Sequence, residues 1–150
     1  MFNKFVKLIC TFFYVGYFPF ASGTVASAVG LLIYVLYHDL PIVYISLFLL
    51  ITLIGFLYSG RMEIMLNRKD PSCVVIDEVS GMMIACFLLP VKASVLITAF
   101  FVFRAFDMFK IYPAQKFEKL HGSAGIMLDD IMAGIYTNII MHSAIRIIGC

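Results

Sequence analysis

The stretch that decides the fold is IVYISLFLLITLIGFLYSG, residues 42–60, in which no side chain carries a charge. At 1.5 Å per helical residue it is nearly long enough to cross a hydrocarbon core about 30 Å thick. A second uncharged run, residues 24–37, precedes it, and the intervening His38-Asp39-Leu40-Pro41 has the polarity and the proline of a turn. The two runs predict a helical hairpin.

Three further apolar runs, at residues 74–89, 94–109 and 131–145, also have the length of helices. The first two form a second hairpin if the chain bends at PVKA, residues 90–93. The sequence therefore predicts an all-α fold, a compact bundle of five very apolar helices with a polar site at one end. At this length we expect one domain, residues 1–150.

The composition favours a membrane-embedded bundle. Hydrophobic residues make up 63% of the chain and charged residues 13%, against about 45–50% and 25% in soluble proteins. The alternative is a soluble bundle with a very apolar core, because several runs are shorter than the roughly 17–25 residues of a full span. A net charge of +2, with Lys and Arg scattered along the chain, excludes nucleic acid as an expected partner.

Positively charged residues orient the predicted bundle, because short cytoplasmic segments collect Lys and Arg. We expect the side of the hairpins that carries most of the basic residues to be cytoplasmic, and only Lys92 and Arg146 lie on the opposite side. The N-terminal run imitates a signal peptide, but we expect it to be retained, because Tyr14, Gly16 and Pro19 interrupt it. The basic residues that fall on one side of the hairpins are Lys4, Lys7, Arg61, Arg68, Lys69, Lys110, Lys116 and Lys119.

Acidic side chains gather at this same end of the predicted helices. Carboxylates beside apolar helices are costly to desolvate unless a cation or hydrogen bonds compensate them. Asp77 and Glu78 point about 100° apart on a helix, so we expect Asp77 alone to face a metal. With Asp129 and Asp130 it offers the oxygen ligands that Mg²⁺ prefers. Alternatively, Asp129-Asp130 opens the last helix, where the helix dipole favours acids without any function.

Two further polar blocks fit an anion site. In FRAFDMFK, residues 103–110, Arg104, Asp107 and Lys110 are three apart and share one helix face. They form either a structural salt-bridge ladder or a grip on phosphate oxygens. Ser22-Gly23-Thr24 precedes a helical run, where it either caps the helix or offers backbone N–H groups to an anion.

These blocks together resemble the phosphatidylglycerophosphatase A family almost from end to end. The resemblance implies a helical protein of the bacterial inner (cytoplasmic) membrane that faces the cytoplasm with its active site. It also implies that Mg²⁺ is used to hydrolyse an anionic phospholipid, phosphatidylglycerophosphate, to phosphatidylglycerol and phosphate. The stretches that carry it are GYFPFASGTVAS (16–27), DP (70–71) with VIDEVSG (75–81), FRAFDMFK (103–110) and GIMLDDIMAG (125–134).

Two rival functions remain. The first is a transporter or ion carrier, whose acids should lie at mid-span. The second is a non-catalytic membrane assembly protein whose salt-bridge ladder fixes helix packing.

On the interpretation as a lipid phosphatase, each block has a role. Asp107 either orients an attacking water or attacks phosphorus itself. The expected assignment is Asp77, Asp129 and Asp130 on the metal, Arg104, Lys110, Ser22, Gly23 and Thr24 on the phosphate, and Asp107 and Glu78 in catalysis.

Overall fold

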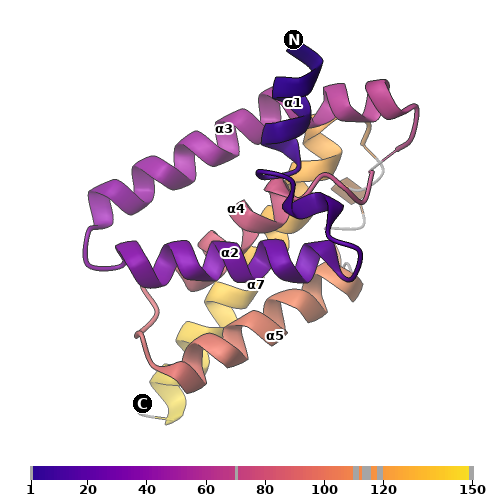
Figure 1. Cartoon of the computed structure of the whole chain (residues 1–150). Helices are drawn as coiled ribbons and strands as arrows, with labels where there is room; N and C mark the ends of the chain where they lie inside the picture. Colours follow the sequence, from indigo (N-terminus) through magenta and orange to yellow (C-terminus); the bar gives the residue numbers. More distant parts are fainter. Residues whose placement is uncertain (1, 70, 110–111, 113–115, 118–119, 149–150) are drawn as a thin grey trace.

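The protein is a helical bundle in the computed structural model, which describes residues 2–69, 71–109, 112, 116–117 and 120–148. Within these ranges the regular structure is entirely helical, so the all-α prediction is confirmed. Figure 1 shows the elements, which are α1 (Phe2–Cys10), the 3₁₀ turn η1 (Val15–Tyr17), α2 (Ser22–Tyr37), α3 (Pro41–Leu66), α4 (Ile76–Cys86), α5 (Ala93–Phe109) and α7 (Ser123–Ile148).

The predicted hairpin between α2 and α3 is present. Pro41 occupies the first turn of α3, where its missing N–H removes no helical hydrogen bond. The helix continues beyond the uncharged run to Leu66 and ends at Asn67, whose φ of 46° is left-handed. The Asn67 N–H donates back to the carbonyls of Glu63 and Ile64. With 26 residues, α3 is about 39 Å long.

The short helix α4 lies at the centre of the bundle and packs against α2, α3, α5 and α7. Nine of its 11 residues are buried. The largest hydrophobic cluster surrounds its side chains Met82 and Met83, together with Tyr34 of α2 and Phe103 of α5. We expected a helix over residues 74–89, but α4 ends at Cys86, where the chain turns through Leu88 with φ of 58°.

Glycines let α4 approach α7 closely. A Cβ atom added to Gly134 would lie 2.3 Å from the carbonyl oxygen of Gly81, and one added to Gly81 would lie 2.6 Å from the carbonyl oxygen of Asp130. Small residues at such a crossing allow two apolar helices to pack backbone against backbone. The crossing therefore fixes the position of the first turn of α4 relative to the acidic segment of α7.

Two elements differ from the sequence-based expectation. The last helix begins at Ser123 rather than at residue 131, so Asp129 and Asp130 lie inside it and not at its opening. The expectation failed because it equated the helix with the run that lacks charges, although Asp is compatible with a helix interior where the site requires it. The N-terminal α1, which was not among the five predicted helices, packs against α3.

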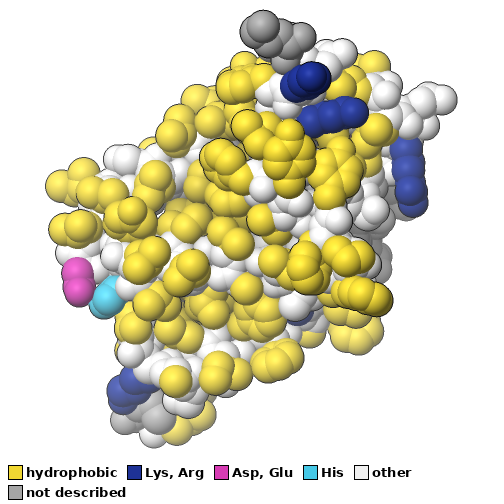
Figure 2. All heavy atoms as spheres, in the orientation of Figure 1, with side chains coloured by type: hydrophobic (Ala, Val, Ile, Leu, Met, Phe, Trp, Pro, Cys, Tyr) yellow, Lys and Arg dark blue, Asp and Glu magenta, His cyan; other side chains and the backbone are white. Residues whose placement is uncertain are grey.

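The outer surface of the bundle is strongly apolar. Figure 2 shows hydrophobic side chains over most of one face, and four leucines on α3, Leu49, Leu50, Leu53 and Leu57, are each more than half exposed. Both α3 and α7 are long and apolar enough to cross a membrane. Only 17% and 22% of their most apolar windows are buried, whereas the core helix of a soluble protein is mostly buried.

Candidate active site

A cavity of about 200 Å³ collects the acidic side chains of three helices. Asp77 and Glu78 come from the first turn of α4, Asp107 from the last turns of α5, and Asp129 and Asp130 from α7. The predicted convergence of the acidic blocks is therefore observed. The full lining is Ser22, Ser72, Val74, Asp77, Glu78, Asp107, Asp129 and Asp130.

The acids of α4 lie where the backbone favours negative charge. Asp77 and Glu78 occupy the first turn, where N–H groups point towards the helix start. We expected Asp77 on the metal and Glu78 in catalysis, and both side chains line the cavity. Asp77 is buried, so its charge is held largely away from water.

The acids of α7 are also buried, and they lie side by side along the chain. One oxygen of Asp129, Oδ1, accepts a hydrogen bond of 3.0 Å from the backbone N–H of Asp130. Oδ2 of Asp130 is buried and receives no hydrogen bond from the described part of the chain. Because α7 begins six residues before Asp129, the helix dipole at its N-terminus does not explain why this pair is acidic.

Arg104 supplies positive charge at the edge of the cavity. Its Nη1 lies 2.5 Å from Oδ2 of Asp107 and 3.3 Å from Oε1 of Glu78. The three side chains are only 14–17% exposed, so these ion pairs are poorly screened by water. The contact with Asp107 is the i,i+3 pair expected for a ladder, but the contact with Glu78 joins α5 to α4. Lys110 lies outside the described residues.

The segment Ser22-Gly23-Thr24 forms the first turn of α2 and does not precede it. The N-cap is Ala21, in a left-handed conformation with φ of 50°, and it makes no side-chain capping bond. The predicted capping role is therefore wrong. Ser22 instead donates a hydrogen bond of 3.1 Å to the carbonyl oxygen of Ser72. Thr24 is not among the residues that line the cavity.

Gly23 allows α2 to pack directly against an acid of the site. A Cβ atom at this position would lie 1.8 Å from Oε1 of Glu78, far inside van der Waals contact. Gly23 therefore acts by leaving room for the Glu78 carboxylate. Ser72 and Val74 were missed from the sequence because neither carries a charge, although both lie between two stretches that carry the family resemblance, residues 70–71 and 75–81.

The chemistry of the cavity fits Mg²⁺ better than a softer metal, because all of its ionisable ligands are carboxylates. Among the described residues, no three His, Cys, Asp or Glu side chains are arranged to hold one metal ion together. Mg²⁺ commonly takes only one or two protein carboxylates and completes its shell with water and phosphate oxygens. The buried Oδ2 of Asp130 is a suitable ligand for such a site.

The nearby thiols do not provide a nucleophile. Burial, reinforced by the charge of Asp77, raises the pKa of the Cys10 thiol to about 12. Burial also raises the pKa of Cys73, in the loop before α4. Since the thiolate is the reactive form, a raised pKa makes both thiols poorer nucleophiles.

Comparison with known proteins identifies the chain as a member of a lipid phosphatase family. A family model described as phosphatidylglycerophosphatase A matches residues 8–145. The chain belongs to the phosphatidylglycerophosphatase A family. Membership makes it a phosphoric monoester hydrolase, and the transporter and assembly-protein alternatives lose their support.

Three relatives cover most of the chain. A putative phosphatidylinositol-3-phosphatase of Bacteroides thetaiotaomicron is 34% identical over 95% of this chain and 94% of its own length. Phosphatidylglycerophosphatase A of Escherichia coli is 32% identical over 85% and 76%, and that of Haemophilus influenzae is 31% identical over 82% and 78%. No solved structure matches the chain.

Adding one carbon atom at Gly23 tests the role of the close contact with Glu78. In Gly23→Ala the flexible Glu78 side chain must move, so we expect the fold to survive but the carboxylate to leave its place beside Arg104. A misplacement of about 1 Å in a catalytic site can cost about 10²-fold in rate, and we expect a loss of that order in phosphate release. Ala28→Val, on the exposed face of the same helix, is the control. Full activity of Gly23→Ala would show that the position of Glu78 is immaterial.

Proposed function

We propose that this protein uses Mg²⁺ to hydrolyse phosphatidylglycerophosphate to phosphatidylglycerol and phosphate, at the cytoplasmic face of the bacterial inner membrane. The observation that carries the proposal is the carboxylate cavity bordered by Arg104, in a chain of this family. Phosphate release from this lipid in mixed detergent micelles, with and without Mg²⁺, is the direct experiment.

In this proposal the acidic residues bind the metal ion and the basic residue binds the phosphate. Asp130, with Asp129 or Asp77, would hold the metal ion, which when bound neutralises phosphate charge and polarises the phosphorus centre. Arg104 is placed to donate two hydrogen bonds to phosphate oxygens, because its guanidinium group already reaches the cavity acids. As the substrate arrives, its phosphate replaces the Asp107 carboxylate as partner of Arg104, while Glu78 keeps its contact.

Asp107 is the candidate for the chemical step. Once Arg104 turns to the phosphate, the Asp107 carboxylate is free to accept a proton from an attacking water. In the alternative, an Asp107 oxygen bonds to phosphorus while the ester bond breaks, and the glycerol oxygen leaves as it takes a proton from a water molecule. Water then cleaves the acyl phosphate and restores the carboxylate. Glu78 holds Arg104 in place from the opposite helix.

The choice of lipid remains to be tested between two phosphomonoesters. The relative from Bacteroides thetaiotaomicron carries the name of a phosphatase for phosphatidylinositol 3-phosphate, whereas two others carry that of phosphatidylglycerophosphatase A. Both substrates present a phosphate monoester on a phospholipid headgroup, so the same carboxylates and Arg104 serve either. Assays on the two lipids side by side decide between them.

The surface around the site supports a location at the membrane interface. Tyr17, Phe18 and Phe20, in the segment that leads into the cavity residue Ser22, are each at least half exposed. Aromatic side chains are enriched at the level of the lipid headgroups. Lys4 is exposed on α1, whose last residue, Cys10, accepts a hydrogen bond from the Val75 N–H just before α4, and basic groups there would attract an anionic lipid surface.

The metal role of the α7 acids predicts separate effects on activity and stability. In Asp129→Asn or Asp130→Asn we expect phosphate release to collapse, with partial rescue by excess Mg²⁺ because occupancy rises by mass action. Folding should persist or improve, because removing one of several close carboxylates relieves repulsion. Asp39→Asn, in the exposed turn, is the control. A Mg²⁺ titration of lipid-phosphate release measures the effect, and near-normal rates with an unchanged Mg²⁺ requirement would contradict the assignment.

Replacing Arg104 by Lys separates phosphate binding from a structural ladder. Lys keeps the charge and can still pair with Asp107, but it lacks the planar pair of donors. We expect the rate to fall about ten- to a hundredfold, as for the loss of one charged hydrogen bond, with little change in unfolding temperature. Arg61→Lys on α3 is the matched control. Full activity of Arg104→Lys would favour the ladder.

Orientation in the membrane can be tested with single cysteines in an otherwise cysteine-free chain. We expect Lys69→Cys to react with a membrane-impermeant maleimide only from the cytoplasmic side, because most Lys and Arg residues lie at that end. Asp39→Cys, in the turn between α2 and α3, should react only from the periplasmic side. The reverse labelling pattern would place the carboxylate cavity on the wrong face for the proposed function.

A further inference from the structure

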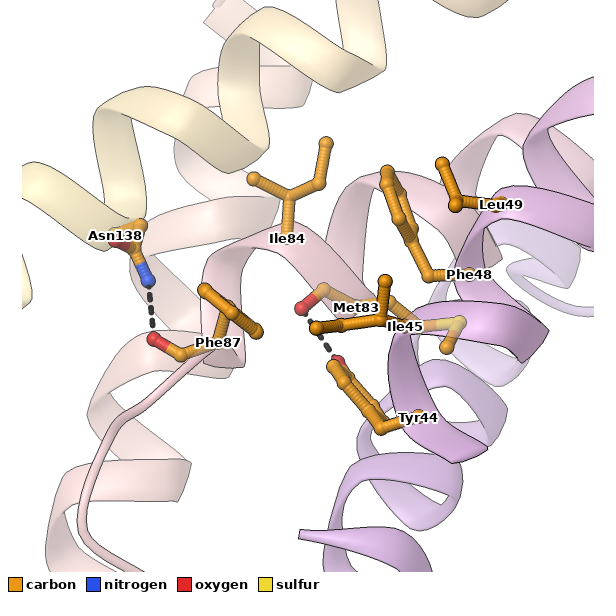
Figure 3. Close-up of a pocket in the computed structure, with 8 residues that line it drawn as sticks. All are labelled: Tyr44, Ile45, Phe48, Leu49, Met83, Ile84, Phe87 and Asn138. Atoms are coloured by element: carbon orange, nitrogen blue, oxygen red, sulfur yellow. Dashed lines mark hydrogen bonds between the residues drawn. The ribbon is translucent and has the colours of Figure 1, made fainter. Parts of the chain in front are cut away.

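A second cavity, of about 280 Å³, lies between α3, α4 and α7. Figure 3 shows Ile45 and Leu49 of α3 on one side, Met83 and Ile84 of α4 along the base, and Asn138 of α7 on the other side. None of the described residues that line it carries a carboxylate. Its lining is thus mainly apolar, whereas the lining of the carboxylate cavity is mainly acidic.

The polar groups at its border are already engaged. Asn138 donates hydrogen bonds of 2.8 Å and 3.2 Å to the carbonyl oxygens of Phe87 and Ala85, and the Tyr44 hydroxyl donates one of 2.6 Å to that of Met83. A buried water needs two to four polar partners, and an apolar cavity of about 150 Å³ stays dry but binds benzene. A hydrocarbon is therefore the ligand that suits this cavity.

The cavity is a wedge that opens towards the outside of the bundle. Helices α3 and α7 meet where the Gly60 N–H donates to Oγ of Ser123, at 2.7 Å, and they diverge from that contact (Figure 1). Ile45 and Leu49, at the outer edge, are 41% and 58% exposed, whereas Met83 at the base is buried. Since both diverging helices are long enough to span a membrane, an empty wedge would forfeit dispersion contacts that a lipid chain supplies.

The wedge and the carboxylate cavity share two helices. Asp77 and Ile84 are seven residues apart on α4, and Asp130 and Asn138 are eight apart on α7, which corresponds to about 10–12 Å along each axis. The close crossing of Gly81 and Gly134 lies between the two cavities. A lipid that reaches both must therefore run along the outer surface of the bundle, where a membrane lipid has access.

We propose that this wedge binds one acyl chain of the phosphomonoester lipid whose headgroup enters the carboxylate cavity. The inference rests on the proposed function and adds a second point of attachment to it. Binding of the chain selects a membrane lipid over a water-soluble phosphate ester. It acts mainly on substrate affinity, because the wedge is remote from the reacting atoms.

The chain contains no tryptophan, so a single introduced Trp reports on the wedge. Leu49→Trp places it at the outer edge of the wedge. Leu50→Trp is a matched control, since Leu50 is the next residue, is 53% exposed and does not line the cavity. The probe is phosphatidylglycerophosphate with brominated acyl chains, added to detergent micelles with EDTA present so that no turnover is needed.

We expect saturable quenching of the Leu49→Trp fluorescence and only weak, non-saturable quenching of Leu50→Trp. Unlabelled phosphatidylglycerophosphate should reverse the quenching, whereas phosphatidylcholine with the same chains should not. Equal quenching of both variants, or equal competition by phosphatidylcholine, would overturn the proposal, because the wedge would then be filled by any surrounding lipid.

Kinetics separate this inference from the proposed function. We expect Leu49→Trp to cost the acyl chain its contact with the wedge over about two methylene groups. The KM of this variant for the long-chain lipid should then rise about tenfold with little change in kcat. Leu50→Trp should match the parent protein. Identical KM values in an active parent and both variants would overturn the chain site alone. A parent that releases no phosphate would overturn the proposed function, and the quenching experiment would still decide whether the wedge binds the chain.

Discussion

Arg104 contacts acids on two helices, and the arrangement of the bundle makes that contact possible. An apolar bundle that collects several buried carboxylates in one place is destabilised by desolvation and by mutual repulsion. A guanidinium group within 3.3 Å of Glu78 and 2.5 Å of Asp107 offsets part of that cost. Protonation of a carboxyl group or a bound cation would offset the rest of the acidic charge, and the Mg²⁺ proposed above is such a cation.

The position of α4 determines whether the acids meet. This helix is too short to cross a membrane, and nine of its 11 residues are buried among the longer helices. Its close crossing with α7 at Gly81 and Gly134 brings the first turn of α4 beside Asp130. The same crossing leaves α3 and α7 free to diverge beyond it, so one packing feature creates both the carboxylate cavity and the apolar wedge.

Much of this arrangement could be predicted from the sequence. Uncharged runs located α2 and α3, and the spacing of charged blocks predicted that Asp77, Glu78, Asp107, Asp129 and Asp130 would meet. Helix ends were less predictable, because charge content was used as the boundary. This placed the start of the last helix eight residues too late, since α7 carries its acids internally. The left-handed Ala21, which replaces a side-chain cap at α2, leaves no mark in the pattern of residue types.

Residues without charge were the hardest to recognise. Ser72 contributes its backbone carbonyl to Ser22, and a carbonyl is present at every position, so no residue type indicates this role. The wedge was likewise hidden, because an Ile or Leu that lines a cavity has the same identity as one that faces lipid. Leu49 and Leu50 are neighbours of the same type and similar exposure, but they point about 100° apart on α3 and only Leu49 lines the wedge.

The two cavities together suit a substrate that is itself divided between a charged headgroup and hydrocarbon chains. A water-soluble phosphate ester would meet the carboxylates and Arg104 but would gain nothing from an apolar wedge about 10–12 Å further along α4 and α7. A lipid gains from both, and its chain need not be withdrawn from the bilayer to do so. In the proposed binding mode, the bilayer would act as solvent for the chain and as the medium that brings it to the protein. The charged reaction would be confined to the carboxylate cavity at the polar end of the bundle.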